Sequence, residues 1–186
     1  SHALARTSPG KIAVLIEAGP AFGTGHHGTT LGCLLALDEV RRNRAIGKVL
    51  DLGTGSGVLA IAAMKGGAHS AIGTDIDFDS VRVANENAEK NHVSGFTALH
   101  ITGANTPRIR QGGPYDTVFA NILMKPLIGL APTIAPLTAP GGTIILSGLL
   151  HHQAGPVRSA FAARGLNFQH RIKRDGWSTL VFRKPG

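Results

Sequence analysis

The residues best suited to chemistry lie in a short glycine-rich turn in the first third of the chain. An acid, Asp51, precedes three glycines at alternate positions, Gly53, Gly55 and Gly57. The apolar residues before the turn predict a short buried strand, and those after it predict a helix. Strand, glycine turn and helix together are typical of a nucleotide-type ligand site at the carboxyl end of a parallel sheet.

The spacing of the glycines indicates which ligand the turn binds. A dinucleotide fold needs Gly-x-Gly-x-x-Gly, which places the helix N-terminus against a pyrophosphate. Here Asp51 lies two residues before Gly53, and a carboxylate in that place repels phosphate but attracts a cation. S-adenosyl-L-methionine carries an ammonium and a sulfonium and no phosphate, so we expect it as the cofactor. Gly53 and Gly55 allow the backbone to approach it without Cβ atoms in the way.

A second acid favours this interpretation over a plain glycine turn. Residues 71–77 are apolar and end in acid, which predicts the next strand. Asp75 follows Gly53 by 22 residues. That is the position at the end of the second strand where a carboxylate binds both ribose hydroxyls. We therefore expect Asp75 to bind the ribose of the cofactor.

Another glycine-rich stretch precedes these motifs, because residues 19–28 contain four glycines. This composition predicts a lid loop in which glycines allow movement and Phe22 excludes water from the site. His26 or His27 could accept the proton that leaves an acceptor amine. Alternatively, a histidine beside glycine only forms hydrogen bonds to the backbone of its loop.

A polar residue at the end of the expected fourth strand, Asn121, would also face the cleft. Its amide could accept a hydrogen bond from the methionine ammonium or hold an incoming amine. Enzymes that methylate a planar amide or a base usually have Asn-Pro-Pro-Tyr or Asp-Pro-Pro-Tyr here, whereas this chain has Asn-Ile-Leu-Met. Without a stacking ring, a flexible amine is the better acceptor. Trp177 either lines the acceptor channel or belongs to the core of a C-terminal hairpin.

The elements that must position these residues alternate between strand and helix. Strands are expected at 49–52, 71–77, 96–102, 115–121 and 143–149, and also at 11–18 near the start. Helices are expected after a Thr29-Thr30 cap, after the glycine turn, after an Asp79 cap, and at 126–137 and 153–164, with a loop at 105–114. This alternation predicts an α/β fold with a parallel sheet. The last two strands, 166–171 and 178–183, have no helix between them and predict an antiparallel edge hairpin.

Composition limits the class of protein. The chain has 186 residues, 42% of them hydrophobic and 16% charged, which suits one globular domain. No apolar run approaches the ~20 residues of a membrane span. The single cysteine, Cys33, lies among leucines, so we expect a buried structural thiol and a reducing, cytoplasmic location. We expect no metal site, because adjacent histidines diverge and acidic or cysteine ligands are missing.

The net charge of +8 is compatible with an RNA-bound partner or with a plain basic surface. The basic residues are scattered, and no run of five like charges occurs. We expect no nucleic acid as the direct substrate.

Four stretches give the chain a resemblance to a known family. They are 21–27 with Thr29-Thr30, 51–57, 120–123 with 126–127, and 146–149. On these stretches the chain resembles the ribosomal protein L-eleven methyltransferases, the PrmA family, over essentially its whole length, and 175–177 look similar too. The glycine motif is common to class I methyltransferases, whereas 22–25 and 121–123 are more specific.

The resemblance implies a class I S-adenosylmethionine-dependent methyltransferase: a Rossmann-like α/β fold whose mostly parallel sheet has an antiparallel C-terminal edge hairpin. It implies methyl transfer to lysine ε-amino and N-terminal α-amino groups of a ribosomal protein. By motif position, the family's cofactor contacts fall on Thr30, Gly53, Asp75 and Asn121. Two other readings stay open: a lysine methyltransferase of another protein, and a non-catalytic cofactor-binding or RNA-binding module.

The family also carries a separate N-terminal domain that recognises the ribosomal protein, and nothing in residues 1–186 resembles it. We expect a single methyltransferase domain, with an N-terminal strand and the lid loop in 1–28 and the cofactor-binding core in 29–186. We therefore expect the chain to bind the cofactor but to methylate the ribosomal protein poorly, because remote substrate contacts position the reacting group.

Overall fold

Seven strands form one sheet in the order β3-β2-β1-β4-β5-β7-β6 in the computed structural model, which describes residues 12–16 and 27–186 except the side chain of His27. The strands from β3 to β5 are parallel, and β7 is antiparallel to both of its neighbours. The strands are β1 (Lys48–Leu52), β2 (Ser70–Asp75), β3 (Phe96–His100), β4 (Tyr115–Asn121), β5 (Thr138–Leu150), β6 (Asn167–Arg174) and β7 (Trp177–Arg183).

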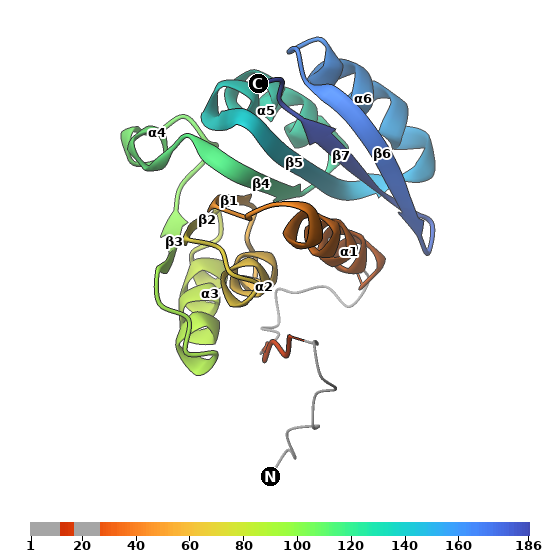
Figure 1. The fold of residues 1–186 in the computed structure, drawn as a ribbon. Helices are drawn as coiled ribbons and strands as arrows, with labels where there is room; N and C mark the ends of the chain where they lie inside the picture. Colours follow the sequence, from red (N-terminus) through yellow and green to blue (C-terminus); the bar gives the residue numbers. More distant parts are fainter. Residues whose placement is uncertain (1–11, 17–26) are drawn as a thin grey trace.

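Helices cover both faces of the sheet (Figure 1). Helices α1 to α3 pack on one face, and α5 and α6 pack on the other. Successive side chains of β4 point to opposite faces of the sheet. Val118 and Ala120 join one hydrophobic core and Phe119 joins the other, so both faces of the strand are apolar. The helices are α1 (His27–Asn43), α2 (Val58–Lys65), α3 (Phe78–Lys90), α4 (Pro107–Gly112), α5 (Met124–Leu137) and α6 (Ala154–Ala162), with a 3₁₀ turn, η1 (His151–Gln153).

The C-terminal hairpin is confirmed, and its turn has a local cause. Asp175 and Gly176 have φ values of 47° and 82°, and two successive positive φ values are the mark of a tight type I′ hairpin turn. Strand β7 inserts between β5 and β6, so β6 is the outermost strand on that side of the sheet.

Two helix starts differ from the expectation. Helix α1 begins at His27, so Thr29 lies within its first turn and does not cap it. Helix α3 is capped by Asp77, whose carboxylate accepts a hydrogen bond from the Ser80 amide at 3.0 Å. The expected cap, Asp79, lies in the first helical turn instead. Both acids satisfy the local preference for a cap, and packing of the preceding strand decides between them.

The expected loop at 105–114 contains a short helix, α4. The Thr106 hydroxyl accepts a hydrogen bond from the Ile109 amide at 3.4 Å, and Pro107 occupies the first helical turn. Threonine followed by proline is a helix start signal. The polar residues and the two glycines of the segment favoured a loop and obscured this signal.

The expected strand at 11–18 is wrong over the part that the structure describes, since residues 12–16 adopt no regular structure. Asn91 takes the place of a pairing strand. Its side-chain oxygen accepts from the Leu15 amide at 2.9 Å, and its side-chain nitrogen donates to the Leu15 carbonyl at 2.6 Å. One amide side chain thus satisfies both backbone groups of Leu15 without a partner strand.

Within the described ranges, each helix is too short or too polar to cross a membrane.

Candidate active site

The glycine turn after β1 depends on left-handed backbone geometry. Gly53, Gly55 and Gly57 have φ values of 70°, 54° and 81°, which residues with a Cβ rarely adopt. A Cβ on Gly53 would lie 2.4 Å from Cγ2 of Ile122. The Gly53 amide donates to the carbonyl of Thr74 at 2.8 Å, which holds the turn against the end of β2.

Asp75, at the end of β2, shapes this turn. Its Oδ2 atom accepts a hydrogen bond from the Gly55 amide at 2.9 Å, and its Oδ1 atom accepts from the Asp77 amide at 3.0 Å. Each carboxylate oxygen has two lone pairs. Asp75 therefore keeps capacity to accept one further hydrogen bond on each oxygen, as two neighbouring hydroxyls would require.

An apolar pocket of about 540 Å³ opens beside Asp75, within the range of small-molecule sites. Two of its side chains are strongly exposed, Ile76 at 70% and Leu123 at 67%. Such exposure is unusual for large aliphatic groups at the ends of strands and marks a surface that a ligand can cover. The pocket is lined by Leu52, Gly53, Thr74, Asp75, Ile76, Ile101, Thr102, Gly103, Ile122, Leu123, Pro126, Gly129 and Leu130.

Asp51 lies beneath the glycine turn and is only 1% exposed. Its Oδ2 atom accepts a hydrogen bond from the Thr54 hydroxyl at 2.8 Å, whereas Oδ1 has no hydrogen-bond partner among the described residues. Burial raises the pKa of Asp51 to about 6, against the effect of the Thr54 bond, and the nearby charge of Asp75 raises it further. A cation above the turn would favour the ionised form of this buried acid.

Asn121, at the end of β4, is held by the first turn of α1. Its Nδ2 atom donates to the hydroxyl of Thr29 at 3.3 Å. The Thr29 carbonyl in turn accepts from the Ser147 hydroxyl at 3.3 Å, and Ser147 shares a hydrogen bond of 2.9 Å with Thr179. The start of α1 is thus tied to β4, β5 and β7. The bond leaves the side-chain oxygen of Asn121 as the atom that can accept from a ligand.

The structure describes only part of the expected residue set. Thr29 contacts Asn121, one position before the expected Thr30, which is half-buried. Phe22 and His26 lie outside the described residues. Ser147 was not singled out as a site residue, although a lone serine in an otherwise apolar strand was a signal that could have identified it.

Ile122 is clamped between glycines of two neighbouring segments. Gly53 approaches its side chain, and a Cβ on Gly148 would lie only 2.3 Å from its carbonyl oxygen. Gly148 has a φ of 83° and sits where the pairing of β5 with β7 shifts register. The two close approaches fix the backbone that carries Asn121 and Leu123 into the site.

The C-terminal hairpin turn packs against the first turn of α1. A Cβ on Gly28 would lie 3.1 Å from both the Arg174 carbonyl and Cδ1 of Trp177. Trp177 pairs with Leu150 at the end of β5 and is half-buried. This tryptophan therefore lies beside the helix turn that holds Asn121.

A polar cluster of Ser178, Arg171 and His151, which no local pattern in the sequence indicates, lies next to Trp177. The hydroxyl of Ser178 is 3.0 Å and 2.7 Å from Nε and Nη2 of Arg171, and 2.9 Å from Nδ1 of His151. Since arginine can only donate, the single hydroxyl proton goes to Nδ1 of His151. With Nδ1 as the acceptor, we expect the ring proton of His151 on Nε2. Arg171 also donates to the His151 carbonyl at 2.9 Å.

Comparisons with known proteins identify the family to which these features belong. Residues 1–185 match the family described as "Ribosomal protein L11 methyltransferase (PrmA)". Two curated relatives carry that name. One from a Caulobacter species is 48% identical over 99% of this chain, and one from Bradyrhizobium diazoefficiens is 50% identical over 100%. The chain spans 64% and 63% of the lengths of these relatives.

Solved structures share the fold. A ribosomal protein L11 methylase from Lactobacillus delbrueckii subsp. bulgaricus superposes with a TM-score of 0.76 at 30% identity, covering 85% of this chain and 79% of that one. The N-methyltransferase NodS from Bradyrhizobium japonicum, solved with S-adenosyl-L-homocysteine, has a TM-score of 0.67 at 13% identity, covering 82% and 84%. The expected class I methyltransferase fold is confirmed, and the chain belongs to the ribosomal protein L11 methyltransferase (PrmA) family.

Proposed function

We propose that this protein transfers methyl groups from S-adenosyl-L-methionine to lysine ε-amino and N-terminal α-amino groups of ribosomal protein L11. The observation that carries the proposal is the Asp75 carboxylate, bonded to the Gly55 amide at the margin of an apolar pocket. The names of the relatives support the choice of acceptor. A ribosomal acceptor also supports a cytoplasmic location.

The residues of the cleft fit the cofactor. Asp75 would accept from the two ribose hydroxyls, and the pocket side chains of Ile76 and Ile101 would pack against the adenine. The glycine turn would let the methionine part approach the backbone. Asp51 is almost fully buried and would have little direct contact with a ligand, so its negative charge would attract the ammonium and sulfonium electrostatically. Its Oδ1 atom, which has no hydrogen-bond partner among the described residues, is consistent with that role.

The bound cofactor supplies a methyl group already activated by a sulfonium, so the protein must mainly place a neutral amine behind it. An ordinary lysine has a pKa of about 10.4, and near pH 7.5 only about 0.1% of it is neutral, a cost of about 4 kcal/mol. Apolar surroundings lower an amine pKa. Leu123 and Trp177 would provide them, and the side-chain oxygen of Asn121 would accept an N–H of the amine and orient its lone pair.

A direct test is transfer of tritium-labelled methyl groups to purified ribosomal protein L11, followed by mass spectrometry of the product. Methylated lysine and N-terminal residues that disappear in Asp75→Ala, and persist in Asp79→Ala, would support the proposal. Asp79 is a matched control because it is an exposed acid in the neighbouring helix turn. Label in another protein of a cell extract, with none in L11, would favour the alternative protein substrate. Label in RNA would overturn the acceptor class.

A further inference from the structure

Almost all of the net positive charge of the chain lies in its C-terminal third. Residues 122–186 contain eight of the 19 Lys and Arg residues but only one of the 11 acids, Asp175, a net charge of +7 out of +8. Residues 1–121 are therefore nearly neutral. Such asymmetry within one domain is a recognised sign of a polyanionic partner.

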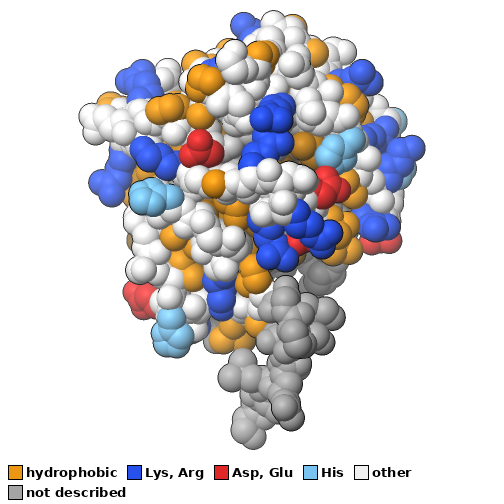
Figure 2. Space-filling view, in the orientation of Figure 1, with side chains coloured by type: hydrophobic (Ala, Val, Ile, Leu, Met, Phe, Trp, Pro, Cys, Tyr) orange, Lys and Arg blue, Asp and Glu red, His pale blue; other side chains and the backbone are white. Residues whose placement is uncertain are grey.

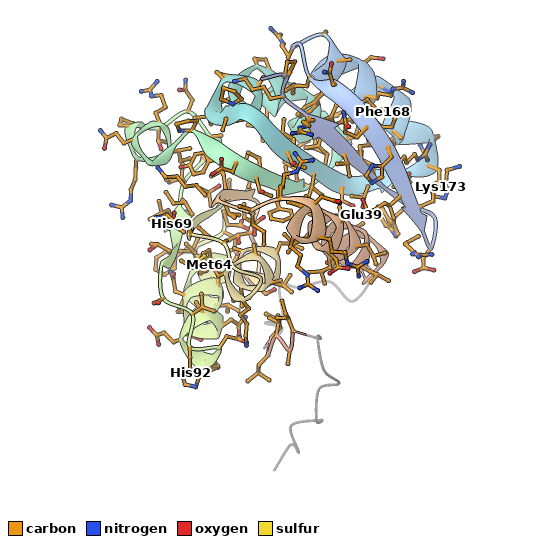
Figure 3. The ribbon with its side chains drawn as sticks, in the orientation of Figure 1. Glu39, Met64, His69, His92, Phe168 and Lys173 are labelled. Atoms are coloured by element: carbon orange, nitrogen blue, oxygen red, sulfur yellow. The ribbon has the colours of Figure 1, made fainter. Side chains whose placement is uncertain are left out.

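Strand β6 carries the densest part of this charge along the open side of the sheet. Lys173 and Arg174 are both exposed and, as neighbours on a strand, point to opposite faces. Figure 3 shows Lys173 at the outer edge, pointing away from the sheet. In Figure 2, Lys and Arg side chains lie along the right side of the face in view, where Figure 1 places β6, and others lie down its middle and at its upper left.

At the other end of β6, two arginines, Arg44 and Arg183, lie close together. Arg44 donates to the carbonyl of Gly141 at 3.2 Å, and a Cβ on Gly141 would lie 3.9 Å from Nη2 of Arg183. Partial burial lowers the pKa of Arg44, and the neighbouring charge of Arg183 lowers it further. Neither guanidinium forms an ion pair with a carboxylate of the described residues. Two like charges held together in this way favour a shared anion.

A simpler explanation is that charge on an edge strand prevents pairing with other chains. Charges of either sign, or a mixture of both, achieve that. Neither β6 nor β7 contains an acid. The acids beside β6 are Glu39, whose Oε2 atom lies 2.8 Å from Nε2 of His170, and Asp175 in the hairpin turn. Edge protection does not require the charges within the two strands to be of one sign, so it does not account for them. The half-buried Arg171 also lies on β6, but its guanidinium already donates hydrogen bonds to Ser178 and His151, so it is not counted among the residues available to a partner.

We propose that Arg44, Arg183, Lys173 and Arg174 form a basic edge that binds the phosphodiester backbone of RNA. Arg183 pairs with Asn167, the first residue of β6, and Arg174 is the last, so the two ends are separated by roughly 23 Å of strand. RNA presents a charge at every nucleotide along such a line, whereas a folded acidic protein rarely does. Guanidinium groups bind phosphate oxygens in a bidentate manner. The RNA is a contact and not the methyl acceptor, so this inference is independent of the proposed function.

The test is fluorescence anisotropy of the full chain with a labelled 20-nucleotide single-stranded RNA over a range of KCl concentrations. Two double variants remove the two ends separately, Arg44→Gln with Arg183→Gln and Lys173→Gln with Arg174→Gln. The matched control is Arg108→Gln with Arg110→Gln, which removes the same charge from α4, where both side chains are exposed. Each of the two basic-edge double variants should bind the RNA about tenfold more weakly. The slope of log affinity against log salt concentration should become shallower by about 1.4 for each of them.

The control should change affinity less than twofold, and circular dichroism should show all variants folded. An equal loss in the control would mean that only net charge matters and would overturn the proposal. Polyglutamate that displaces the RNA at equal charge concentration would point instead to an acidic protein partner. RNA affinity that is unchanged in both basic-edge double variants would also exclude this site.

Discussion

The side chain of Asn121, at the end of β4, donates a hydrogen bond of 3.3 Å to the hydroxyl of Thr29, a residue 92 positions earlier in the chain. This bond joins the first turn of α1 to the strand end that faces the cleft. Because one amide hydrogen binds Thr29, the plane of the Asn121 amide is set before any ligand arrives. The arrangement is a form of preorganisation, since the accepting oxygen needs no reorientation.

Thr29→Val should therefore impair turnover more than cofactor binding. Valine keeps the shape of the buried threonine but leaves Nδ2 of Asn121 without its acceptor, a loss of roughly 1–3 kcal/mol. We expect kcat to fall about tenfold while the Kd for S-adenosyl-L-methionine changes less than threefold. Thr30→Val is the matched control, because it makes the same change at the next, half-buried position. If Thr30→Val were the damaging variant, the motif-based assignment of Thr30 would stand and the role of Thr29 would be wrong.

Asp75→Ala should reduce cofactor affinity at least tenfold. The carboxylate offers charge-assisted hydrogen bonds to two hydroxyls, each contributing roughly 1.5–3 kcal/mol. It also fixes the Gly55 amide at 2.9 Å, so Asp75→Asn separates the two roles by keeping an acceptor without the charge. Titration calorimetry measures both variants against Asp79→Ala. Unchanged affinity in Asp75→Ala would remove the ribose assignment.

The buried Asp51 should make stability and binding depend on pH in opposite directions. Its pKa rises from 3.8 to about 6 on folding, so the native state holds a proton that the unfolded state releases. This contribution to the free energy of unfolding is present below pH 3.8 and is lost as pH rises through 6, by up to about 3 kcal/mol. Chemical denaturation without cofactor should show Asp51→Asn gaining stability over the native chain between pH 4 and pH 7.

Cofactor affinity should follow the ionised form of Asp51 and rise as pH increases through 6. Calorimetry at pH 6 in buffers of different ionisation enthalpy should detect proton release on binding, and Asp51→Asn should abolish it. Binding without proton exchange in the native chain would show that Asp51 does not sense the charge of the ligand.

The Ser178 cluster should contribute to stability and fix one histidine tautomer. Ser178→Ala removes the acceptor of two arginine donors in a fully buried position, so we expect a loss of about 1–3 kcal/mol in the free energy of unfolding. His152→Ala, at the exposed neighbouring position, should stay within about 0.5 kcal/mol. Nitrogen-15 spectra of His151 should show a proton on Nε2 and none on Nδ1. A proton on Nδ1 would contradict the assigned direction of the hydrogen bond.

Much of the fold and part of the site follow from local patterns in the sequence. Alternating strand and helix signals predicted the parallel sheet, and a helix-free connection predicted the antiparallel hairpin. The spacing of Asp51, Gly53 and Gly55 and the later Asp75 predicted a turn whose geometry the structure reproduces. Cys33 is buried, as its apolar neighbours indicated. These features depend on residues close together in the chain, or on strands whose order the fold class already implies.

Other features needed the tertiary structure because their physical cause is packing between distant segments. Thr29 and Thr30 have the same chemistry, and only the point at which α1 meets β4 decides which one reaches Asn121. Asp77 and Asp79 are equally good caps until the end of β2 fixes the first helical turn. The scattered basic residues form no run in the sequence, yet the close approach of Arg44 and Arg183 at Gly141 arises because β7 inserts beside β5. Residues that become neighbours only through the order of the strands are distant in the sequence, so no local sequence pattern indicates their contact.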